Sequence, residues 1–174
     1  MKKNQIQIYT DGAAKGNPGR AGWGAVVLFG QNSGDPKGVH EIGGKVEHAT
    51  NNQMELTAPI EALKYIKKYL ARQGLAESSA EIVSDSKYVI LGITEWIFNW
   101  QKNNWRNAAK KPVLNKELWQ ELHKLTQELT CPPKRRELKW RYIEGHNGNK
   151  WNERADEIAT SFAEGKNILL KKRK

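Results

Sequence analysis

Alternating polar and apolar positions in the first third of the chain predict three β-strands. Residues 5–10 alternate in the way typical of a strand, and residues 23–29 form a second, mostly apolar one. The Gly- and Pro-rich residues 11–22 between them predict a tight connection. After a polar loop at residues 31–38, a third strand over residues 39–46 would complete an antiparallel meander.

Apolar residues at helical spacing predict a long helix over residues 51–70. Thr50, Asn51 or Asn52 can cap its start. Pro59 conflicts with a regular helix, because an interior proline removes a backbone hydrogen bond at a cost of about 3 kcal/mol, so we expect a kink there or a helix that starts late. The later segments predict, in order, a strand over 80–84, helices over 87–91 and 94–101, a basic loop over 105–111, a helix over 115–129, a strand over 138–143 and a helix over 151–163.

This order of elements predicts an α/β fold. Its five-stranded mixed sheet would have three antiparallel strands followed by two that run parallel to the first, with helices covering the sheet. A chain of 174 residues suits one domain with a hydrophobic core. We expect that domain to span residues 1–164, followed by a basic C-terminal tail over residues 165–174 that is disordered.

The charge balance indicates a polyanionic partner. Lys and Arg total 29 and Asp and Glu total 19, which gives a formal net charge of +10. Nucleic acid fits this surplus first and an acidic membrane surface second. Residues 171–174 carry four of the surplus charges, so a protein with an ordinary surface and a basic tail would show a similar balance.

Three further features bear on the protein's surroundings. The single Cys131 cannot form a disulfide within the chain, which fits a reducing compartment. The N-terminal residues show no apolar signal-peptide stretch, and no window approaches about 18 uninterrupted apolar residues. We therefore expect a cytoplasmic monomer that uses no membrane and no small-molecule cofactor.

Four carboxylates stand at positions that favour chemistry. Asp11 follows the first predicted strand, Glu55 lies in the first turn of the long helix, Asp85 follows the fourth strand, and Asp156 lies in the last helix. Ligands of open parallel sheets bind beyond the carboxyl ends of the strands, so Asp11 and Asp85 can converge there, and the packed helices can add the other two. Converging carboxylates repel unless cations neutralise them, and oxygen ligands suit Mg²⁺ or Mn²⁺. Two such ions could activate a water and stabilise the leaving oxygen in phosphodiester cleavage.

Each carboxylate taken alone has an ordinary explanation. An Asp that follows a strand, such as Asp11 or Asp85, is most often a turn residue or a helix cap. A Glu in a first helical turn complements the helix dipole, which would account for Glu55. Asp156 can pair with Arg154 or Lys150 on a solvated face. The segments around the carboxylates have to decide between the two interpretations.

Those segments resemble the motifs of type 1 bacterial ribonuclease H. The motifs occur in family order from residue 6 to about residue 161, nearly the whole chain. They are YTDGAAKGNPG at 9–19, TNNQMEL at 50–56, SDSKYV at 84–89 with GITEWI at 92–97, EGHNG at 144–148 and NERADEIA at 152–159. The resemblance implies a ribonuclease H-like fold and makes residues 1–164 the catalytic domain.

The same resemblance implies an endonuclease that hydrolyses the RNA strand of an RNA/DNA hybrid and leaves 5′-phosphate and 3′-hydroxyl ends. It implies that Asp11, Glu55, Asp85 and Asp156 bind two Mg²⁺ ions, with Mn²⁺ as a possible substitute. His146, between Gly145 and Gly148 on a loop, would assist proton transfer or product release, a task that suits a near-neutral pKa.

The substrate-binding residues follow from the resemblance as well. Thr50 matches a residue that holds a phosphate of the DNA strand, and further polar residues match positions that face the hybrid: Asn17, Asn51, Asn52, Lys87 and Asn152. Asn51 and Asn52 can equally be helix caps. A basic, aromatic protrusion would grip the DNA strand with Trp96, Trp100, Trp105, Lys102, Arg106, Lys110 and Lys111. Its tryptophans can instead fill a local core, which we expect first of Trp105.

Two other classes stay open beside this one. One is another nuclease or strand-transfer enzyme of the same fold. Proofreading exonucleases carry Asp-x-Glu on the first strand, whereas Asp11 is followed here by Gly12 and Ala13. Integrases use a different carboxylate spacing. The other class is a non-catalytic hybrid-binding module, which should have lost at least one carboxylate, and the chain retains all four.

Overall fold

Five strands form one mixed sheet in the computed structural model, which describes residues 4–30, 38–74, 78–130 and 136–173. Their order across the sheet is β3-β2-β1-β4-β5. Three of them pair antiparallel: β1 (Asn4–Gly16), β2 (Gly19–Phe29) and β3 (Gly38–Ala49). The other two, β4 (Ser78–Ser84) and β5 (Glu137–Tyr142), continue the sheet in parallel with β1. The predicted α/β fold with this strand arrangement is confirmed.

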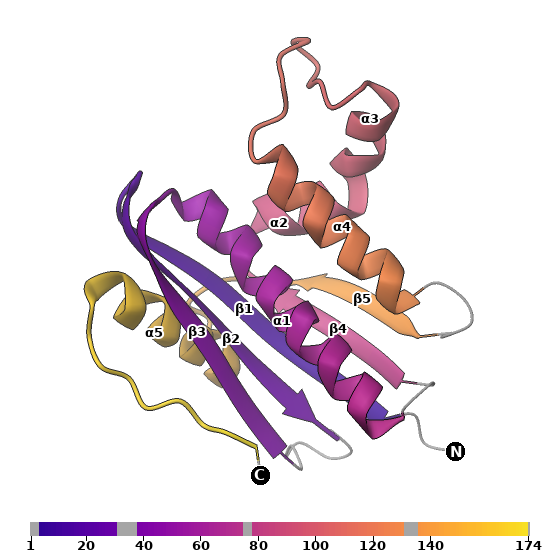
Figure 1. The fold of residues 1–174 in the computed structure, drawn as a ribbon. Helices are drawn as coiled ribbons and strands as arrows, with labels where there is room; N and C mark the ends of the chain where they lie inside the picture. The colour runs from indigo at the N-terminus through magenta and orange to yellow at the C-terminus, as the bar shows by residue number, and fades with distance from the viewer. Residues whose placement is uncertain (1–3, 31–37, 75–77, 131–135, 174) are drawn as a thin grey trace.

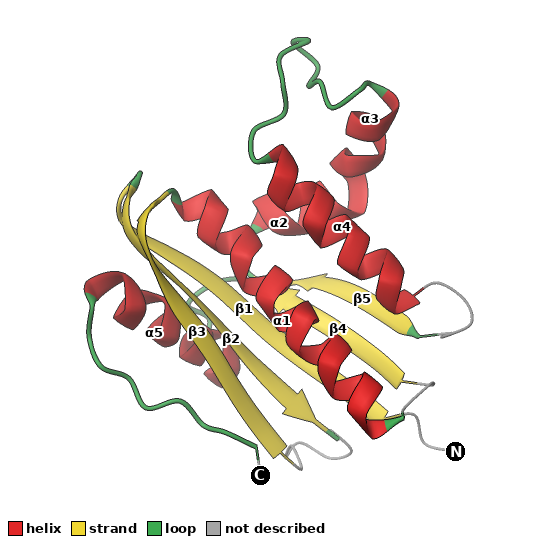
Figure 2. Ribbon diagram, viewed as in Figure 1, coloured by secondary structure: helices red, strands yellow, loops and turns green. Residues whose placement is uncertain are grey.

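Helices cover both faces of the sheet (Figure 2). On one face lie α1 (Asn51–Gln73) and α4 (Lys116–Thr130), and on the other lies α5 (Lys150–Glu164). Three short segments lead from the end of β4 away from the sheet into a protrusion (Figure 1): α2 (Lys87–Leu91), the π-helical η1 (Gly92–Trp96) and α3 (Ile97–Lys102).

The main core lies between the sheet and the helices α1 and α4. It includes Ile8 from β1, Leu56 and Leu63 from α1, and Trp119 from α4, all fully buried. Trp119 also explains the glycine at the start of η1, since a Cβ on Gly92 would lie 2.0 Å from the Trp119 ring. The base of the protrusion therefore packs directly on α4.

The first hairpin is longer than the sequence predicts. Residues 11–16 and 19–22, which the Gly-rich pattern assigned to a connection, extend β1 and β2, so Asp11 lies within a strand. The glycines serve close packing here. A Cβ on Gly12 would lie 2.3 Å from the backbone nitrogen of Glu55, and one on Gly22 would lie 2.3 Å from the carbonyl oxygen of Ala159. Their absence of side chains lets α1 and α5 approach the hairpin from opposite faces.

The long helix begins where its cap predicts. Thr50 accepts from the backbone N–H of Gln53 at 3.2 Å, and the Gln53 side chain accepts from the Thr50 N–H at 2.8 Å, which forms a capping box. The alternative of a late start is therefore wrong, and the helix runs without interruption through Pro59. Because it begins at Asn51, Glu55 lies in the second turn instead of the first, beyond the reach of simple dipole complementation.

The C-terminal segment, defined as residues 166–173, differs from the disordered tail that we expected. It runs beside α5 and β3 (Figure 1), and Ile168 and Leu170 pack against buried residues of that face. The backbone N–H of Glu41 on β3 donates to the carbonyl of Lys171 at 2.7 Å. Apolar residues within the basic run make this contact, which the composition of the segment did not indicate.

Three further expectations concern a loop, the single cysteine and membrane-spanning helices. The loop at residues 31–37 and Cys131 lie outside the described residues. Among the helices that the structure does describe, none combines the length and the apolar character needed to cross a membrane.

Candidate active site

Strand pairing brings the first two carboxylates together. Tyr9 on β1 pairs with Val83 on the parallel neighbour β4, and Asp11 and Asp85 each follow that pair by two residues. Both strands thus bring an aspartate to the same end of their parallel pairing, as the sequence predicted.

The third carboxylate comes from α1. Gly12 lets that helix approach β1 so closely that Glu55 lies next to Asp11. Asp11, Glu55 and Asp85 each offer one oxygen, and these oxygens all lie within 4.8 Å of one another. Asp11 is 6% exposed and Glu55 is 8% exposed, which excludes solvated surface roles for both. We call these three residues the acidic cluster.

Without a bound cation, full ionisation of the acidic cluster is unfavourable, because its three carboxylates repel one another. Burial, followed by the charges of Asp85 and Asp156, raises the pKa of Asp11 to about 8, against a weaker lowering by the Gly12 N–H. That N–H donates to Asp11 Oδ1 at 2.8 Å. Burial, followed by Asp11 and Asp85, also raises the pKa of Glu55.

A bound cation would balance the negative charge of the acidic cluster and give its buried carboxylate oxygens a partner. Glu55 Oε2 is buried and has no hydrogen-bond partner among the described residues. The donor set consists of hard carboxylate oxygens, which suit divalent ions of the Mg²⁺ and Mn²⁺ type. The residues present therefore fit a divalent metal ion.

Asp156 borders the acidic cluster from α5. Asp11 pairs with Gly24 across the hairpin, and a Cβ on Gly24 would lie 2.6 Å from the carbonyl of Ala155, the residue before Asp156. The nearby charge of Asp156 contributes to raising the pKa of Asp11. Its Oδ1 accepts from the Thr160 hydroxyl at 3.3 Å. It lies beside the three-residue cluster without belonging to it.

Asn152, which we expected to face the hybrid, lies against Asp85. It is 3% exposed. Its Nδ2 donates to Asp85 Oδ2 at 3.0 Å, and its Oδ1 is buried without a partner among the described residues. The first turn of α5 thereby orients Asp85. Asn149 caps this helix, accepting from the N–H groups of Trp151 and Asn152 at 3.1 Å each.

The loop that carries His146 touches the acidic cluster. A Cβ on Gly145 would lie 2.7 Å from Asp85 Oδ2, so the glycine allows the loop to pass over this carboxylate. His146 itself is exposed and has a φ of 54°. The structure thus places the imidazole one residue from the contact with Asp85, and its catalytic role stays a prediction.

Several of the residues that we expected to face the hybrid make hydrogen bonds within the protein. Asn17 Oδ1 accepts from the backbone N–H of Asn51 at 3.0 Å, and Asn51 Nδ2 donates to Glu55 Oε1 at 3.4 Å. Thr50 is the helix cap described above, whereas Asn52 and Lys87 are exposed. The structure groups these residues around the start of α1 and the start of α2, on the side of the acidic cluster.

The protrusion combines a packed aromatic stem with exposed cations. Trp100 is the centre of the stem, with ring centroids 5.9 Å from Trp96, 6.4 Å from Trp105 and 5.3 Å from Trp119. Trp100 and Trp105 are half-buried against the main core, as we expected of Trp105. The four basic residues are exposed, and Arg106 Nη1 donates to the carbonyl of Lys110 at 2.9 Å: Lys102, Arg106, Lys110 and Lys111.

Two residues near the site were not singled out by the sequence. The Tyr88 hydroxyl accepts from Asn115 Nδ2 at 3.1 Å and from Trp119 Nε1 at 3.2 Å, which fixes the base of the protrusion. Tyr142 ends β5 with an exposed ring beside Lys87. Tyr88 lies within the motif SDSKYV, which could have indicated it, but nothing in the local pattern indicates Tyr142.

The fold and the acidic cluster define a class of α/β domains in which carboxylates suited to a divalent metal ion lie just beyond the paired stretch of two neighbouring parallel strands. Residues 3–164 match the RNase H family, and the chain belongs to this metal-dependent family.

Similar proteins agree with this assignment. Proteins named ribonuclease H from Thermosynechococcus vestitus and Dichelobacter nodosus are each 47% identical, over 94% and 91% of this chain and 92% of each relative. Among solved structures, LC9-RNase H1, described as a type 1 RNase H, matches with a TM-score of 0.76 at 25% identity, covering 96% of this chain and 75% of that one. LC11-RNase H1, solved in complex with an RNA/DNA hybrid, matches with a TM-score of 0.66 at 26% identity over 92% and 97%.

Proposed function

We propose that this protein is an endoribonuclease that hydrolyses the RNA strand of RNA/DNA hybrids with the help of Mg²⁺, leaving 5′-phosphate and 3′-hydroxyl ends. The observation that carries the proposal is the acidic cluster, with three carboxylate oxygens within 4.8 Å at the edge of a ribonuclease H fold. Relatives over most of the chain are named ribonuclease H, and one similar structure holds an RNA/DNA hybrid.

Asp11, Glu55 and Asp85 would hold the metal, and Asp156 would complete the set toward a second ion. Bound Mg²⁺ or Mn²⁺ ions would supply an activated water and charge stabilisation at the leaving oxygen. The protein's own contribution is to keep these carboxylates together despite their repulsion. The Gly12 N–H and the Asn152 side chain each donate to one of them and thereby set its orientation.

His146 would move the proton that the reaction requires. Its exposed position on the loop beside Asp85 lets the imidazole reach a bound strand without serving as a ligand of the buried cluster. General acid–base help of this type typically gives about 10²- to 10⁴-fold in rate.

Recognition of the RNA strand would depend on its 2′-hydroxyl groups, which DNA lacks. Asn17 and Asn51 are linked to each other and, through Asn51, to Glu55, so a ribose at the acidic cluster would meet them first. Thr50, Asn52 and Lys87 lie on the same side. The exposed cations of the protrusion would hold phosphates of the DNA strand, and Trp96 and Trp100 would pack on its sugars.

We also place the enzyme in the cytoplasm as a monomer that requires no small-molecule cofactor. The single cysteine, which cannot form a disulfide within the chain, supports a reducing compartment. Sedimentation at several protein concentrations would show a constant mass of one chain.

The proposal is tested by cleavage of three matched substrates: an RNA/DNA hybrid, an RNA duplex and a DNA duplex. We expect Mg²⁺- or Mn²⁺-dependent cuts in the RNA of the hybrid alone. Asp11→Asn keeps the side-chain volume, removes a ligand charge and should abolish these cuts while the protein stays folded. Binding of the hybrid without any cleavage in either metal would instead identify a non-catalytic module, and cleavage of DNA would identify another nuclease of this fold.

A further inference from the structure

Tyr142 presents an aromatic ring at the edge of the candidate active site. It is the last residue of β5, the edge strand, and is 40% exposed. In the parallel pairing it lies opposite Ser84, the residue before Asp85. The N–H of Ile143 then donates to the carbonyl of Ser84 at 3.0 Å, so the chain beyond Tyr142 stays attached beside β4.

An open cavity of about 340 Å³ lies between this ring and α2. Its lining consists of Tyr142 with Ile90 and Leu91 as apolar walls, and Lys87 as the charged member. The ammonium of Lys87 lies 5.5 Å from the centroid of the Tyr142 ring. The cavity thus offers a flat apolar surface and one exposed positive charge side by side.

Tyr142 lies within a few nucleotide spacings of the acidic cluster. Tyr142 precedes Gly145 by three residues, a separation of at most roughly 11 Å between their Cα atoms. Gly145 contacts Asp85. A nucleic-acid strand advances about 3.4 Å along the helix axis per nucleotide, so a strand whose reacting phosphate lies at Asp85 reaches Tyr142 within about three nucleotides.

We infer that this cavity binds a ribose of the RNA strand, within about three nucleotides of the cut. The apolar face of the sugar lies on the Tyr142 ring, and the adjoining phosphate meets Lys87. In a paired hybrid the faces of the bases are stacked inside the duplex, so an aromatic ring at the surface meets the sugars of the strand and not the faces of its bases. The inference rests on the proposed function, because the strand that is cut is the one that lies at Asp85.

The test compares four proteins: wild type, Tyr142→Ala, Tyr142→Phe and Leu169→Ala, the last a control for loss of an exposed apolar side chain elsewhere. Hybrid affinity is measured in Ca²⁺ to suppress cleavage, and steady-state kinetics are measured in Mg²⁺. Loss of roughly 40 Å² of apolar contact predicts about fivefold weaker binding for Tyr142→Ala. The Tyr142→Phe and Leu169→Ala proteins should bind within about twofold of wild type.

Two readouts separate a sugar contact from a general structural effect. The Michaelis constant of Tyr142→Ala should rise while kcat stays unchanged, because the contact lies away from the reacting atoms. The slope of log affinity against log salt should also stay unchanged, whereas Lys87→Ala should flatten it by about 0.9, the value for one phosphate.

A scan of the substrate identifies the occupant. In a series of hybrids, one ribonucleotide at a time is replaced by an acyclic spacer that keeps the phosphate but lacks the sugar ring. The penalty of Tyr142→Ala should vanish at one RNA position near the cut and persist at all others. Equal affinity of wild type and Tyr142→Ala for the intact hybrid, or a penalty that is sensitive only to the DNA strand, overturns the inference. Both results leave the proposed function standing, which fails only if the wild-type protein does not cleave the hybrid.

Discussion

The guanidinium of Arg154 on α5 holds the carboxylate of Glu41 on β3 through two hydrogen bonds, Nε to Oε1 at 2.9 Å and Nη2 to Oε2 at 2.8 Å. Glu41 is 0% exposed. The C-terminal segment joins the pair, since the N–H of Lys171 donates to Glu41 Oε2 at 2.8 Å and the carbonyl of Leu169 accepts from Arg154 Nη2 at 2.8 Å. The pair therefore connects the edge of the sheet with the helix that carries Asp156.

Glu41→Gln should lower the free energy of unfolding by about 3 kcal/mol at pH 7, because it leaves the partly buried Arg154 guanidinium without the charge of its partner. Burial alone would raise the pKa of Glu41, but the hydrogen bonds from Arg154 and Lys171 outweigh it and lower that pKa below its usual value. The stabilisation is therefore present above the unfolded-state pKa and is lost as pH falls through the folded-state pKa.

Urea unfolding at pH 7 and at pH 3 to 4 measures this directly: the difference between wild type and Glu41→Gln should shrink at the lower pH. The control is Glu157→Gln, which removes the exposed partner of Arg154 on the same helix. It should cost less than about 1 kcal/mol. Equal losses for the two variants would contradict the importance of the buried pair.

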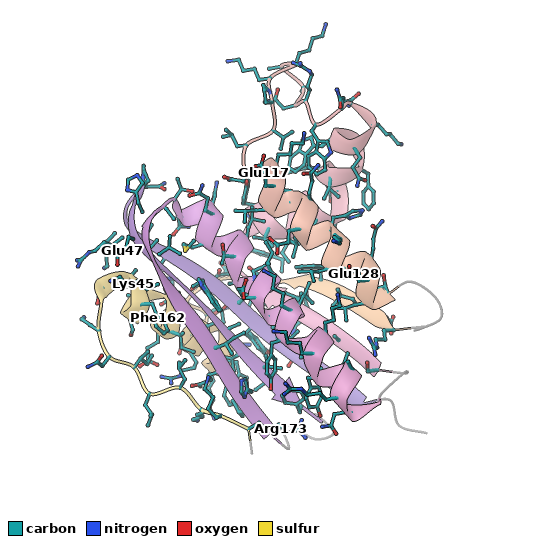
Figure 3. The ribbon with its side chains drawn as sticks, viewed as in Figure 1. Lys45, Glu47, Glu117, Glu128, Phe162 and Arg173 are labelled. Atoms are coloured by element: carbon teal, nitrogen blue, oxygen red, sulfur yellow. The ribbon has the colours of Figure 1, made fainter. Side chains whose placement is uncertain are left out.

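Removal of residues 166–174 should destabilise the fold more than it weakens hybrid binding. The guanidinium of Arg173 lies 4.3 Å from the Phe29 ring centroid and 5.1 Å from that of Tyr69, and Lys172 Nζ donates to the carbonyl of Glu41 at 3.0 Å. Figure 3 shows Arg173 at the end of the sheet opposite the protrusion. These cations already have partners within the protein.

We expect a loss of about 2–4 kcal/mol for this truncation, which lowers Tm by roughly 5–15 °C for a chain of this size. The salt dependence of hybrid binding should change little. A truncated protein with unchanged Tm and strongly reduced affinity would show that residues 166–174 act as a free basic arm, as their composition alone indicates.

Asn152→Ala should weaken metal binding by about 10- to 100-fold, the usual effect of removing a group that orients a metal ligand. The reason is the hydrogen bond from its Nδ2 to Asp85 Oδ2 at 3.0 Å. Calorimetric titration with Mn²⁺ measures the affinity, with Asn147→Ala, an exposed residue of the same type, as the control. If both variants bound Mn²⁺ as wild type does, Asn152 would serve only to pack the first turn of α5.

His146→Ala should reduce kcat by about 100-fold, at the lower end of the range for general acid–base help, and leave metal affinity nearly unchanged. The exposed imidazole lies on a loop over Asp85 but outside the acidic cluster. Single-turnover cleavage and Mn²⁺ titration of the same protein separate the two effects. Loss of metal binding in this variant would make His146 a ligand and refute its assignment to proton transfer.

Residues 5–10 and 23–29 were predicted as strands because their apolar residues recur at the spacing of a strand. Helices cover both faces of the sheet, so residues 6–10 and 24–29 are buried on both faces, and their hairpin pairing is local in the sequence. The positions of Asp11 and Asp85 followed from this sheet order alone.

Features that depend on contacts between distant segments escaped the sequence. The strand character of residues 11–16 was hidden because Gly12 is selected by the approach of α1 rather than by a turn. The path of the C-terminal segment depends on Glu41, more than 120 residues earlier in the chain. Asn152 reads as one more polar residue on a helix, and only the packing of α5 on the sheet turns it toward Asp85.

The protrusion provides the last prediction. Lys102, Lys110 and Lys111 are exposed, and changing all three to Ala should raise the Michaelis constant while kcat stays largely intact, because the acidic cluster lies elsewhere. Each phosphate contact contributes about 0.9 to the slope of log affinity against log salt, so the slope should flatten by up to about 2.7. Arg106 is left in place because it donates to the carbonyl of Lys110 and supports the loop itself.

The measurement is a salt titration of hybrid binding in Ca²⁺ for wild type, the triple variant and a control with Lys64, Lys67 and Lys68 changed to Ala. The control removes the same number of charges from α1, where Lys64 and Lys67 pair with carboxylates on α4. If general positive charge attracts the hybrid, both triple variants flatten the slope equally. A smaller slope in the protrusion variant alone requires phosphates in contact with these three lysines, since counterions are released only where a phosphate is neutralised locally. An unchanged slope in that variant would remove the protrusion from the binding surface.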